Sequence, residues 1–511
     1  MVEHFIFNKL DYPVITAAML VPAAGIFVLL LLRKPGLIRG VSLATTILAF
    51  IVSLPLYMGF DRTTYKAQFV ERYSWLPSWN LYYTVGVDGI SLPFILLITI
   101  ISILCILVSW RTINERVRDF HICLLSMVTI MIGIFVSLDL FQFFIFWEAM
   151  LIPMFLLIGV WGGEDRIHAA VKFLLFTLGG SIFMLAGIVA LFFLGGKTFD
   201  IYILSSTGFP LKTQLWLFAA FFAAFAVKIP LVPFHSWLPS AYREAPTAAT
   251  VLMAAVLAKM GTYGFLRISF PLFPEASRLL IDPLIALSVV SIIYGAYLAL
   301  AENDLKRLIA YSSLSHMGFI ALGIFTLNKA GIEGGTLQMI NHGVITGALF
   351  ICAGIINERT QNMRIGDYGG LSKSVPMFAA VFTIFALAGS GFPGLNYFVG
   401  EFLILSGAFK ASLLFASLSI FGVILSVAYL GWLYYRLILG EQNPETEGRL
   451  YDLSKREFLM LLPLVFITIY VGLQPQALLS FMDASVEHLI ERLAADGQEI
   501  AGITNMAENA K

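Results

Sequence analysis

The chain has 511 residues, of which 59% are hydrophobic and 13% are charged, and its mean hydropathy is +0.87. Soluble domains carry about 25% charged residues, so this composition excludes a soluble globular protein and indicates an integral membrane protein. Because 32 basic residues balance 32 acidic ones, the net charge gives no support to a nucleic-acid partner, and we expect the lipid bilayer instead.

Long apolar runs follow one another along the chain. About fourteen of them reach the roughly 18 residues that cross a bilayer, and the period-two alternation of a membrane β-barrel is missing. The stretch MVEHFIFNKLDYP before the first run lacks the basic region of a signal peptide, so we expect that run to be retained. The connections 59–85 and 195–213 fit interfacial segments, and 481–495 fits a surface helix. The sequence therefore predicts an all-α polytopic membrane protein.

The spans fall into four predicted parts. Residues 1–118 hold helices 1–3, and residues 438–511 hold the last transmembrane helix and the C-terminal tail. Between them, residues 119–271 (helices 4–8) and 278–437 (helices 9–13) hold five spans each. Because five is an odd number, a second copy must cross the membrane in the opposite direction. We predict two inverted five-helix repeats.

Each repeat is interrupted at its fourth span. The first interruption reads VKIPLVPFHSW and the second reads ALAGSGFPGLNYFVGEF. Paired Gly/Pro-broken helices at matching positions are typical of transporters with an ion path near mid-membrane, although two unrelated kinks would give the same pattern. Pro230 frees a carbonyl one turn earlier, and such backbone is tolerated at depth only where protein or water satisfies it.

Lysine and arginine are distributed unevenly between the two sides of the predicted bundle. The short loops on one side hold about 17 of them, against about 11 in longer segments on the other. By the positive-inside rule, the richer side faces the cytoplasm, and both termini are expected outside.

The sequence shows no cofactor motif. Cys105, Cys123 and Cys352 lie singly in apolar runs, without a C-x-x-C or a Cys/His cluster. No G-x-G-x-x-G after a strand and no phosphate-binding loop appears. We therefore expect neither a cofactor nor a metal in this chain.

Four basic residues fall inside the predicted spans. Lys172 and Arg267 lie near span ends, where long side chains can reach the interface. Lys228 and Lys259 lie deeper, where a lysine costs about 2.5 to 3.5 kcal/mol on insertion scales. A desolvated lysine gives up its proton more readily than one in water. These two lysines are therefore candidates for a proton-relay site.

Two acidic residues accompany them. Glu148 is the one charge in its span, and it fits either a counter-charge for Lys228 or Lys259 or a structural ion pair within the bundle. Glu401 follows the second break, so the second repeat places an acid where the first places Lys228. The two halves are thus predicted to carry related scaffolds with opposite charge.

Three histidines lie in or at the edge of spans. His316 and His342 are candidate relay groups because imidazole titrates near neutral pH, and His235 is a weaker candidate. Each of the three also fits a helix-packing residue. Asp304 and Lys306 fit a solvated helix start, with Asp304 in the N-terminal turn.

Five long segments resemble one family. They are GVDGISLPF (86–94), EAMLIPMFLLIGVWGGEDRIHAAVKFLLFTLGGS (148–181), LPSAYREAPTAATVLMAAVLAKMGTYGFLR (238–267), DLKRLIAYSSLSHMGF (304–319) and GFPGLNYFVGEFLIL (391–405). Together they resemble the M-type antiporter-like subunits of proton-pumping NADH:quinone oxidoreductase, respiratory complex I, over nearly the whole chain. Tyr242 stands where this family often has histidine, and Tyr397 stands where it commonly has glycine.

The resemblance implies a proton relay and assigns its members by position. They are Glu148, Lys228, Lys259, His316, His342 and Glu401. The acid at Glu401 resembles the M-type, since the sister L and N subunits and the Mrp-type antiporters generally have lysine there.

The resemblance also implies an activity and a setting. The chain would move protons in a translocase that couples electron transfer from NADH to quinone, with flavin, iron-sulfur clusters and quinone in partner subunits. Its neighbours would be L-type and N-type subunits and small membrane subunits, in a bacterial inner (plasma) membrane. An Mrp-type monovalent cation/proton antiporter subunit and a mainly structural membrane-arm subunit are the alternatives.

Overall fold

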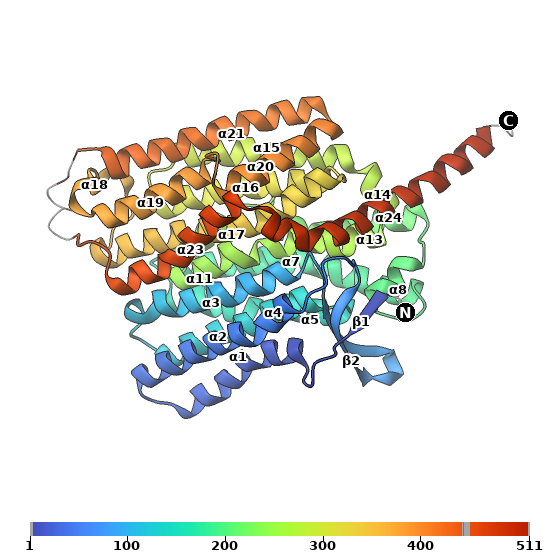
Figure 1. Cartoon of the computed structure of the whole chain (residues 1–511), viewed down its shortest axis with the longest axis horizontal. Helices are drawn as coiled ribbons and strands as arrows, with labels where there is room; N and C mark the ends of the chain where they lie inside the picture. Colours follow the sequence, from blue (N-terminus) through green and yellow to red (C-terminus); the bar gives the residue numbers. More distant parts are fainter. Residues whose placement is uncertain (1–3, 442, 444–449, 509–511) are drawn as a thin grey trace.

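The computed structural model describes residues 4–441, 443 and 450–508, with side chains described up to residue 494. It is a bundle of long helices that run side by side (Figure 1). The long helices are α1 (Val14–Leu31), α2 (Pro35–Met58), α3 (Leu92–Thr112), α4 (Val117–Val136), α5 (Leu140–Ala149), α6 (Leu151–Trp161), α7 (Arg166–Leu194), α9 (Leu211–Lys228), α15 (Ile281–Ala301), α16 (Leu305–Phe325), α17 (Lys329–Thr360), α21 (Leu413–Tyr434), α23 (Lys455–Leu473) and α24 (Gln476–Glu508).

Thirteen helical spans in the described residues are long and apolar enough to cross a membrane. The helices α5 and α6 form one of them together, and α21 continues through the π-helical η6 (Tyr435–Leu439). Another span, Thr247–Leu272, consists of α11 (Thr247–Leu252), the π-helical η3 (Met253–Leu257), α12 (Lys259–Gly264), the π-helical η4 (Phe265–Ser269) and α13 (Phe270–Leu272). A broken pair of shorter helices, α19 (Pro376–Gly389) and α20 (Asn396–Ala411), makes the fourteenth. The prediction of an all-α protein with about fourteen transmembrane helices is confirmed.

The first break separates α9 from α10 (Trp237–Glu244). Pro230 has no N–H to continue the helix, and the groups it displaces find other partners. The Val227 carbonyl accepts the Trp237 indole N–H at 2.9 Å, and the Val232 N–H donates to the Ser291 hydroxyl at 3.0 Å. The break is therefore satisfied by protein at depth, as helix interruptions in membranes require.

The second break separates α19 from α20 and depends on glycine. Gly391 and Gly394 have φ of +74° and +92°, a region that other residues rarely adopt. A Cβ on Gly391 would lie 2.6 Å from the Glu401 carboxylate. Both interruptions predicted from the sequence are thus real, and the second folds its loop back onto the acid that follows it.

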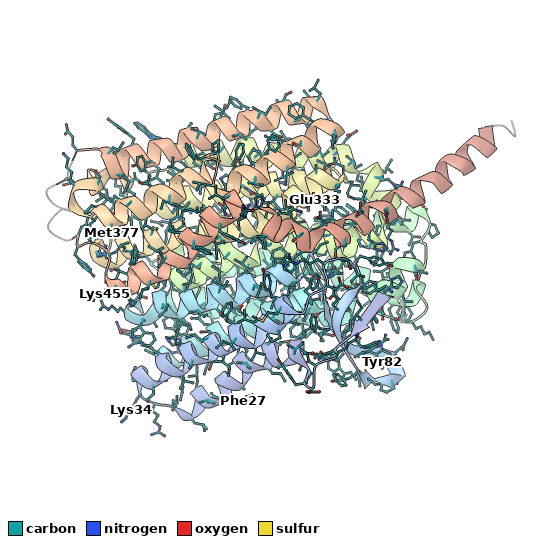
Figure 2. The ribbon with its side chains drawn as sticks, viewed as in Figure 1. Phe27, Lys34, Tyr82, Glu333, Met377 and Lys455 are labelled. Carbon is teal, nitrogen blue, oxygen red and sulfur yellow. The ribbon has the colours of Figure 1, made fainter. Side chains whose placement is uncertain are left out.

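The innermost spans are Thr247–Leu272, α16 and α17. In their most apolar windows 94% to 100% of residues are buried, against 28% in α2. Outer helices instead expose large apolar side chains such as Phe27 and Met377 (Figure 2), which is the pattern of a lipid-facing surface. The division of the chain into four parts and the boundaries of the two repeats stay predictions.

One end of the bundle carries elements that the sequence reading missed. The connection 59–85 contains the hairpin of β2 (Ala67–Leu76) and β3 (Leu81–Val87), and β1 (Phe5–Phe7) pairs parallel to β2. The predicted surface helix lies within α24, where Phe481, Met482 and Val486 are buried.

The remaining short helices of the described residues are η2 (Pro77–Trp79), α8 (Ile201–Ser206), α14 (Pro274–Leu279), η5 (Ile365–Asp367) and α18 (Leu371–Ser374).

Several of the basic residues that the sequence groups together lie at one end of the bundle. Lys34 and Lys455 lie at one end, whereas Tyr82 lies in the hairpin at the other (Figure 2). Arg243 and Arg307 also lie at the end with the lysines, where they line one polar cavity. The loops that the sequence grouped by their basic residues are therefore near one another.

Candidate functional site

Lys228 ends α9 at the first break and is 1% exposed. Its Nζ lies 5.1 Å from the centre of the Trp147 ring and 5.7 Å from that of Phe173, both close enough for cation–π attraction. The charge of Glu148, one residue after Trp147 on α5, acts on this ammonium group. Among the described residues, neither Lys228 Nζ nor Glu148 Oε1 has a hydrogen-bond partner. The lysine is held by aromatic faces and a nearby acid rather than by a fixed ion pair.

Lys259 lies at the centre of the bundle, at the start of α12 and just after η3, and is fully buried. Its Nζ donates to the Ala254 carbonyl in the π-helical stretch and lies 2.6 Å from His342 Nδ1. Single π-helical turns occur frequently at functional sites, and this one places a backbone acceptor beside the amine. Lys259 and His342 thus form one hydrogen-bonded unit that joins the two halves of the chain.

His342 on α17 is contacted on both ring nitrogens. Its Nδ1 meets Lys259, while its Nε2 lies 3.0 Å from the Ser313 hydroxyl and 3.3 Å from the Thr346 hydroxyl. A neutral imidazole has one donor and one acceptor nitrogen, and both become donors when it is protonated. A proton that arrives at one nitrogen of His342 can therefore leave from the other.

His316 and Glu401 form the next part of the site. His316 Nδ1 on α16 lies 3.4 Å from Glu401 Oε1 on α20, and its Nε2 lies 3.0 Å from the Tyr429 hydroxyl. The ring centres of His316 and His342 are 6.3 Å apart. Tyr397 lies between them, with its ring centre 4.9 Å from that of His316 and its hydroxyl 3.5 Å from Thr346.

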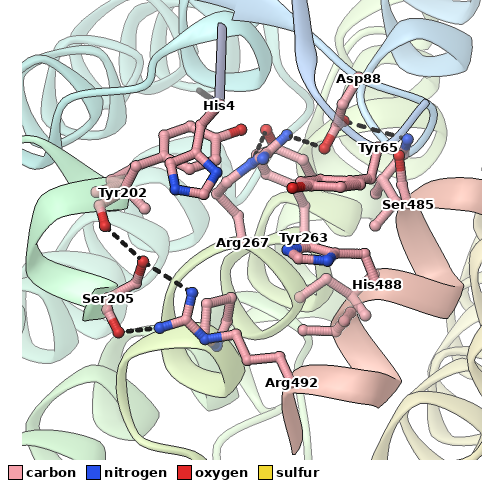
Figure 3. Close-up of a pocket in the computed structure, with 15 residues that line it drawn as sticks. His4, Tyr65, Asp88, Tyr202, Ser205, Tyr263, Arg267, Ser485, His488 and Arg492 are labelled. Atoms are coloured by element: carbon pink, nitrogen blue, oxygen red, sulfur yellow. Dashed lines mark hydrogen bonds and ion pairs between the residues drawn. The ribbon is translucent and has the colours of Figure 1, made fainter. Parts of the chain in front are cut away.

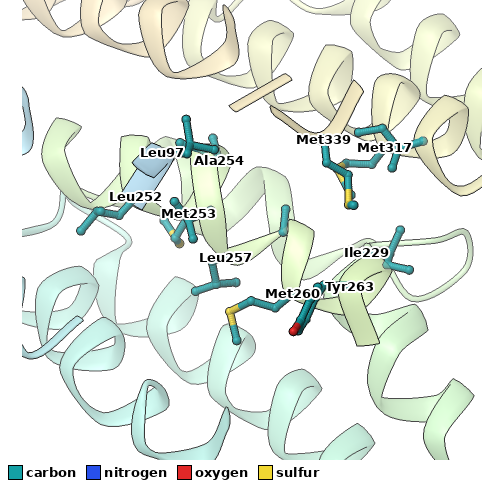
Figure 4. Packing of buried hydrophobic residues seen from close by; sticks show 14 of the residues in the cluster. Leu97, Ile229, Leu252, Met253, Ala254, Leu257, Met260, Tyr263, Met317 and Met339 are labelled. Carbon is teal, nitrogen blue, oxygen red and sulfur yellow. The ribbon is translucent and has the colours of Figure 1, made fainter. Parts of the chain in front are cut away.

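Apolar side chains surround this axis. Ile229, Met260, Met317 and Met339 are fully buried where α12 faces α16 and α17 (Figure 4). Such packing excludes bulk water, so charges interact several times more strongly here than they would in water. A change of protonation at one group therefore alters the free energy of the charged form at its neighbours.

The structure brings the six predicted site residues together in two groups. Lys259 contacts His342, and His316 lies 3.4 Å from Glu401, with 6.3 Å between the ring centres of the two histidines; Glu148 and Lys228 lie near each other, apart from this axis. No hydrogen bond or ion pair joins Lys228 to Lys259 in the part of the chain that the structure describes. His235, the weaker candidate, stacks edge-to-face on Tyr294 at 5.3 Å, outside the axis.

Two sequence predictions about basic residues are wrong. Arg267 does not reach the interface: it is buried and pairs with Asp88 at 2.8 Å, because α8, α24 and the segments on either side of the hairpin cover that end of its helix. Lys306 is buried rather than exposed, and its Nζ donates to the carbonyls of Arg243 at 3.3 Å and Ala245 at 2.9 Å. The expected N-terminal turn at Asp304 is confirmed, because its carboxylate accepts the Arg307 N–H at 3.0 Å.

The sequence reading missed the hydroxyl groups of the axis, Ser313, Thr346, Tyr397 and Tyr429. Serine and threonine are frequent in membrane helices, so their presence alone carries little signal. Thr346 does lie four residues after His342, and neighbours at that spacing share a helix face. A search for hydroxyls at helical spacing from the histidines would have found it.

A polar cavity of about 1110 Å3 opens at the basic end of the bundle, lined in part by Arg243, Glu244 and Lys306. Tyr242, next to Arg243 in α10, is fully buried, and its hydroxyl lies at the Ser313 side chain. That hydroxyl has no partner of regular hydrogen-bond geometry among the described residues. Tyr242 and Ser313 thus lie between this cavity and His342.

Comparison with known proteins agrees with this arrangement. Residues 137–427 match the family model described as NADH:quinone oxidoreductase/Mrp antiporter, TM. The NADH-quinone oxidoreductase subunit M of Rhodobacter capsulatus is 44% identical over 91% of this chain and 93% of its own length. The NADH-ubiquinone oxidoreductase chain 4 of Marchantia polymorpha is 42% identical over 94% of this chain and 97% of its own length.

Solved structures agree as well. A chain of respiratory complex I from Thermus thermophilus with bound NADH superposes with a TM-score of 0.86 and 34% identity, covering 94% of this chain and 99% of that one. A chain of the Mrp complex from Dietzia sp. DQ12-45-1b gives a TM-score of 0.81 at 20% identity, over 94% of this chain and 99% of that one, a likeness that shows the fold alone.

The broken helices and the buried lysine–histidine–acid axis define the class: a multi-pass, antiporter-like membrane subunit. The similarity to subunit M and chain 4 proteins extends over nearly the full length of this chain and of its relatives. The chain therefore belongs to the NADH-quinone oxidoreductase subunit M family.

Proposed function

We propose that this subunit moves protons along Glu148, Lys228, Lys259, His342, His316 and Glu401. The observation that carries the proposal is the 2.6 Å contact between Lys259 Nζ and His342 Nδ1, with the Ser313 hydroxyl 3.0 Å from Nε2. An amine, an imidazole and a hydroxyl in that order can pass a proton without large movement, because each is a donor in one state and an acceptor in the other.

The transfer from His342 to His316 crosses the 6.3 Å between the ring centres. The Thr346 and Tyr397 hydroxyls lie beside this gap and can orient ordered water across it. Glu401 then accepts the proton from His316 and stabilises the imidazolium while it is charged.

The Glu148–Lys228 pair would control the occupancy of Lys259 by charge rather than by contact. When Glu148 holds Lys228 protonated, a second ammonium at Lys259 is disfavoured by repulsion in the dry core. When the influence of Glu148 is weakened, Lys228 releases its proton and Lys259 can take one up. This alternation is how a redox event in partner subunits would reach the axis.

Protons would enter from the polar cavity at the basic end, through Tyr242 and Ser313 to His342. The positive-inside rule supports placing this end in the cytoplasm and both termini outside. The resemblance to bacterial subunit M proteins supports the bacterial inner membrane as the location.

The oxidoreductase activity would belong to the complex, with flavin, iron-sulfur clusters and quinone in partner subunits. L-type and N-type antiporter-like subunits and small membrane subunits are the proposed neighbours. Glu148 supports a place beside another subunit, since it is only partly buried here and lies near the lipid-facing Ile152, which is 68% exposed.

Proteoliposomes that contain the intact complex test the proposal. Lys259→Met is expected to lower NADH-driven proton uptake per NADH oxidised by at least about tenfold, since loss of one proton-transfer group costs roughly 10²–10⁴ in rate. His235→Ala, outside the axis, should pump normally. Normal pumping by an assembled Lys259→Met complex would contradict the relay.

A further inference from the structure

A second cavity, of about 80 Å3, lies at the end of the bundle opposite the polar cavity (Figure 3). The segments on either side of the hairpin, α8 and α24 form its walls, with polar or titratable side chains from His4, Tyr65, Tyr202, Ser205, Ser485, His488 and Arg492. Its volume is enough for several water molecules, since each needs about 10–15 Å3 by this measure. Water at this end can therefore approach the transmembrane core closely.

The floor of the cavity is the ion pair of Arg267 and Asp88. Arg267 Nη2 lies 2.8 Å from Asp88 Oδ2, and the two side chains are 9% and 6% exposed. Asp88 is fixed in turn, because its Oδ1 accepts the N–H groups of Ile90 at 3.2 Å and Ser91 at 2.9 Å at the start of α3. The guanidinium is therefore held at the inner edge of the cavity (Figure 3).

The same helical span connects this floor to the relay. Lys259, Tyr263 and Arg267 follow one another at intervals of four residues, so Arg267 lies about 12 Å along the span from Lys259. Arg267 Nε donates to the Tyr263 hydroxyl at 3.0 Å, and that hydroxyl donates to the Phe135 carbonyl at 2.9 Å. The one proton of Tyr263 is thus committed to a backbone acceptor and is not offered to Lys259.

A guanidinium in this place cannot relay protons. Arginine keeps its proton at any physiological pH, unlike lysine or histidine. Arginines that keep their charge in this way help to exclude protons and cations in channels. Asp88 lowers the free-energy cost of burying the guanidinium and holds Arg267 in place beside Tyr263.

We propose that Arg267, held by Asp88, is an electrostatic seal that prevents protons on Lys259 from exchanging with the cavity beside α24. The inference rests on the proposed relay role of Lys259. The two ends of the bundle then differ in whether they let protons reach the axis. Hydroxyls lead inward from the polar cavity to His342, whereas an arginine that cannot deprotonate blocks the opposite end. A proton on Lys259 must therefore pass to His342.

The test is passive proton flux through the intact complex in proteoliposomes, driven by a potassium diffusion potential without NADH. The double variant Arg267→Met/Asp88→Asn removes both charges, and buried ion pairs replaced in this way often leave stability little changed. We expect passive proton flux to rise at least about tenfold, which corresponds to a barrier lower by roughly 1.4 kcal/mol. Arg492→Gln, a charge removed from the cavity wall, is the matched control and should not leak.

A third substitution identifies the route. Adding Lys259→Met to the double variant should return the flux to the wild-type level, because the leak passes through that amine. Wild-type flux in the assembled double variant, or a leak that persists without Lys259, overturns the seal. Failure of the relay itself would appear separately, as normal NADH-driven pumping in Lys259→Met alone.

Arg267→Lys covers the case in which the double variant does not assemble. It keeps the charge and the pairing with Asp88 but introduces a group that can release a proton when desolvated. We expect an assembled Arg267→Lys complex to leak several-fold more than wild type, and a wild-type flux would overturn the proposal.

Discussion

The two broken helices share an architecture and differ in how they hold their charge. At the first break Lys228 faces aromatic rings and lies near Glu148 without a hydrogen-bond partner among the described residues. At the second break Glu401 lies 3.4 Å from His316 and packs against the Gly391 turn. One half thus holds a lysine with no acid within ion-pair distance in the described residues, and the other holds an acid at ion-pair distance from a histidine.

The backbone of each break matches this difference. Proline makes the first break, and side chains of Trp237 and Ser291 satisfy the displaced groups. Glycines make the second, where the turn must approach the carboxylate closely. The comparison shows that one type of broken helix can serve two roles, depending on the residue at the break. Lys228 would control the charge of the relay, and Glu401 would accept the proton at its end.

The largest expected effect comes from Lys228. Lys228→Arg keeps the positive charge but cannot release its proton, so NADH-driven pumping should fall by roughly 10²-fold, as in Lys228→Met. Lys172→Met on α7, a partly exposed lysine, is the control and should pump normally. Pumping close to wild type in an assembled Lys228→Arg complex would show that proton release at the first break is not needed.

The second break should respond less steeply to loss of charge. Glu401→Gln keeps the shape of the side chain and removes its charge, so we expect pumping to fall about tenfold, less than the roughly 10²–10⁴ that loss of a proton-transfer group costs. The control is Glu333→Gln, which changes an acid near the start of α17 that lies 3.8 Å from Lys329. A Glu401→Gln complex as inactive as Lys228→Arg would remove the proposed difference between the halves.

The sequence alone revealed the charged part of this site, because a charge in a long apolar run is rare and conspicuous. Lys228, Lys259 and Glu401 were recognisable for that reason. The burial of Arg267 was not, since position near a span end does not show that α8, α24 and the segments on either side of the hairpin cover it. The hairpin itself escaped notice because shifts in its register disturb the alternation that predicts strands.

The contacts of Ser313 with His342 and of Tyr397 with His316 could not be predicted from the sequence, for another reason. Ser313 and Tyr397 become informative only when three helices place them beside His342 and His316. Their contacts lie 29 and 81 positions apart in the chain, respectively, and helical spacing says nothing at such separations.

Removing the side-chain donor that satisfies the backbone at the first break is expected to lower the thermal stability of the complex without lowering its proton pumping. Trp237→Phe leaves the buried Val227 carbonyl without its donor, which costs about 1–3 kcal/mol. The thermal midpoint of the complex in detergent should fall while pumping per NADH stays near normal. Trp432→Phe, at a side chain that is 49% exposed, should leave the midpoint unchanged. An unaltered midpoint in Trp237→Phe would mean that another group satisfies the carbonyl.

The smallest expected effect comes from the two glycines of the second break. Substituting them separates backbone strain in the turn from contact between the turn and Glu401. Gly391→Ala and Gly394→Ala both force a Cβ into the left-handed region, at roughly 1–2 kcal/mol each. A Cβ at Gly391 also meets the Glu401 carboxylate, whereas one at Gly394 meets nothing within 4 Å. Both variants should lower the thermal midpoint slightly, but only Gly391→Ala should also slow pumping, by a few-fold. Equal pumping in the two would show that the turn shapes the backbone without positioning the acid.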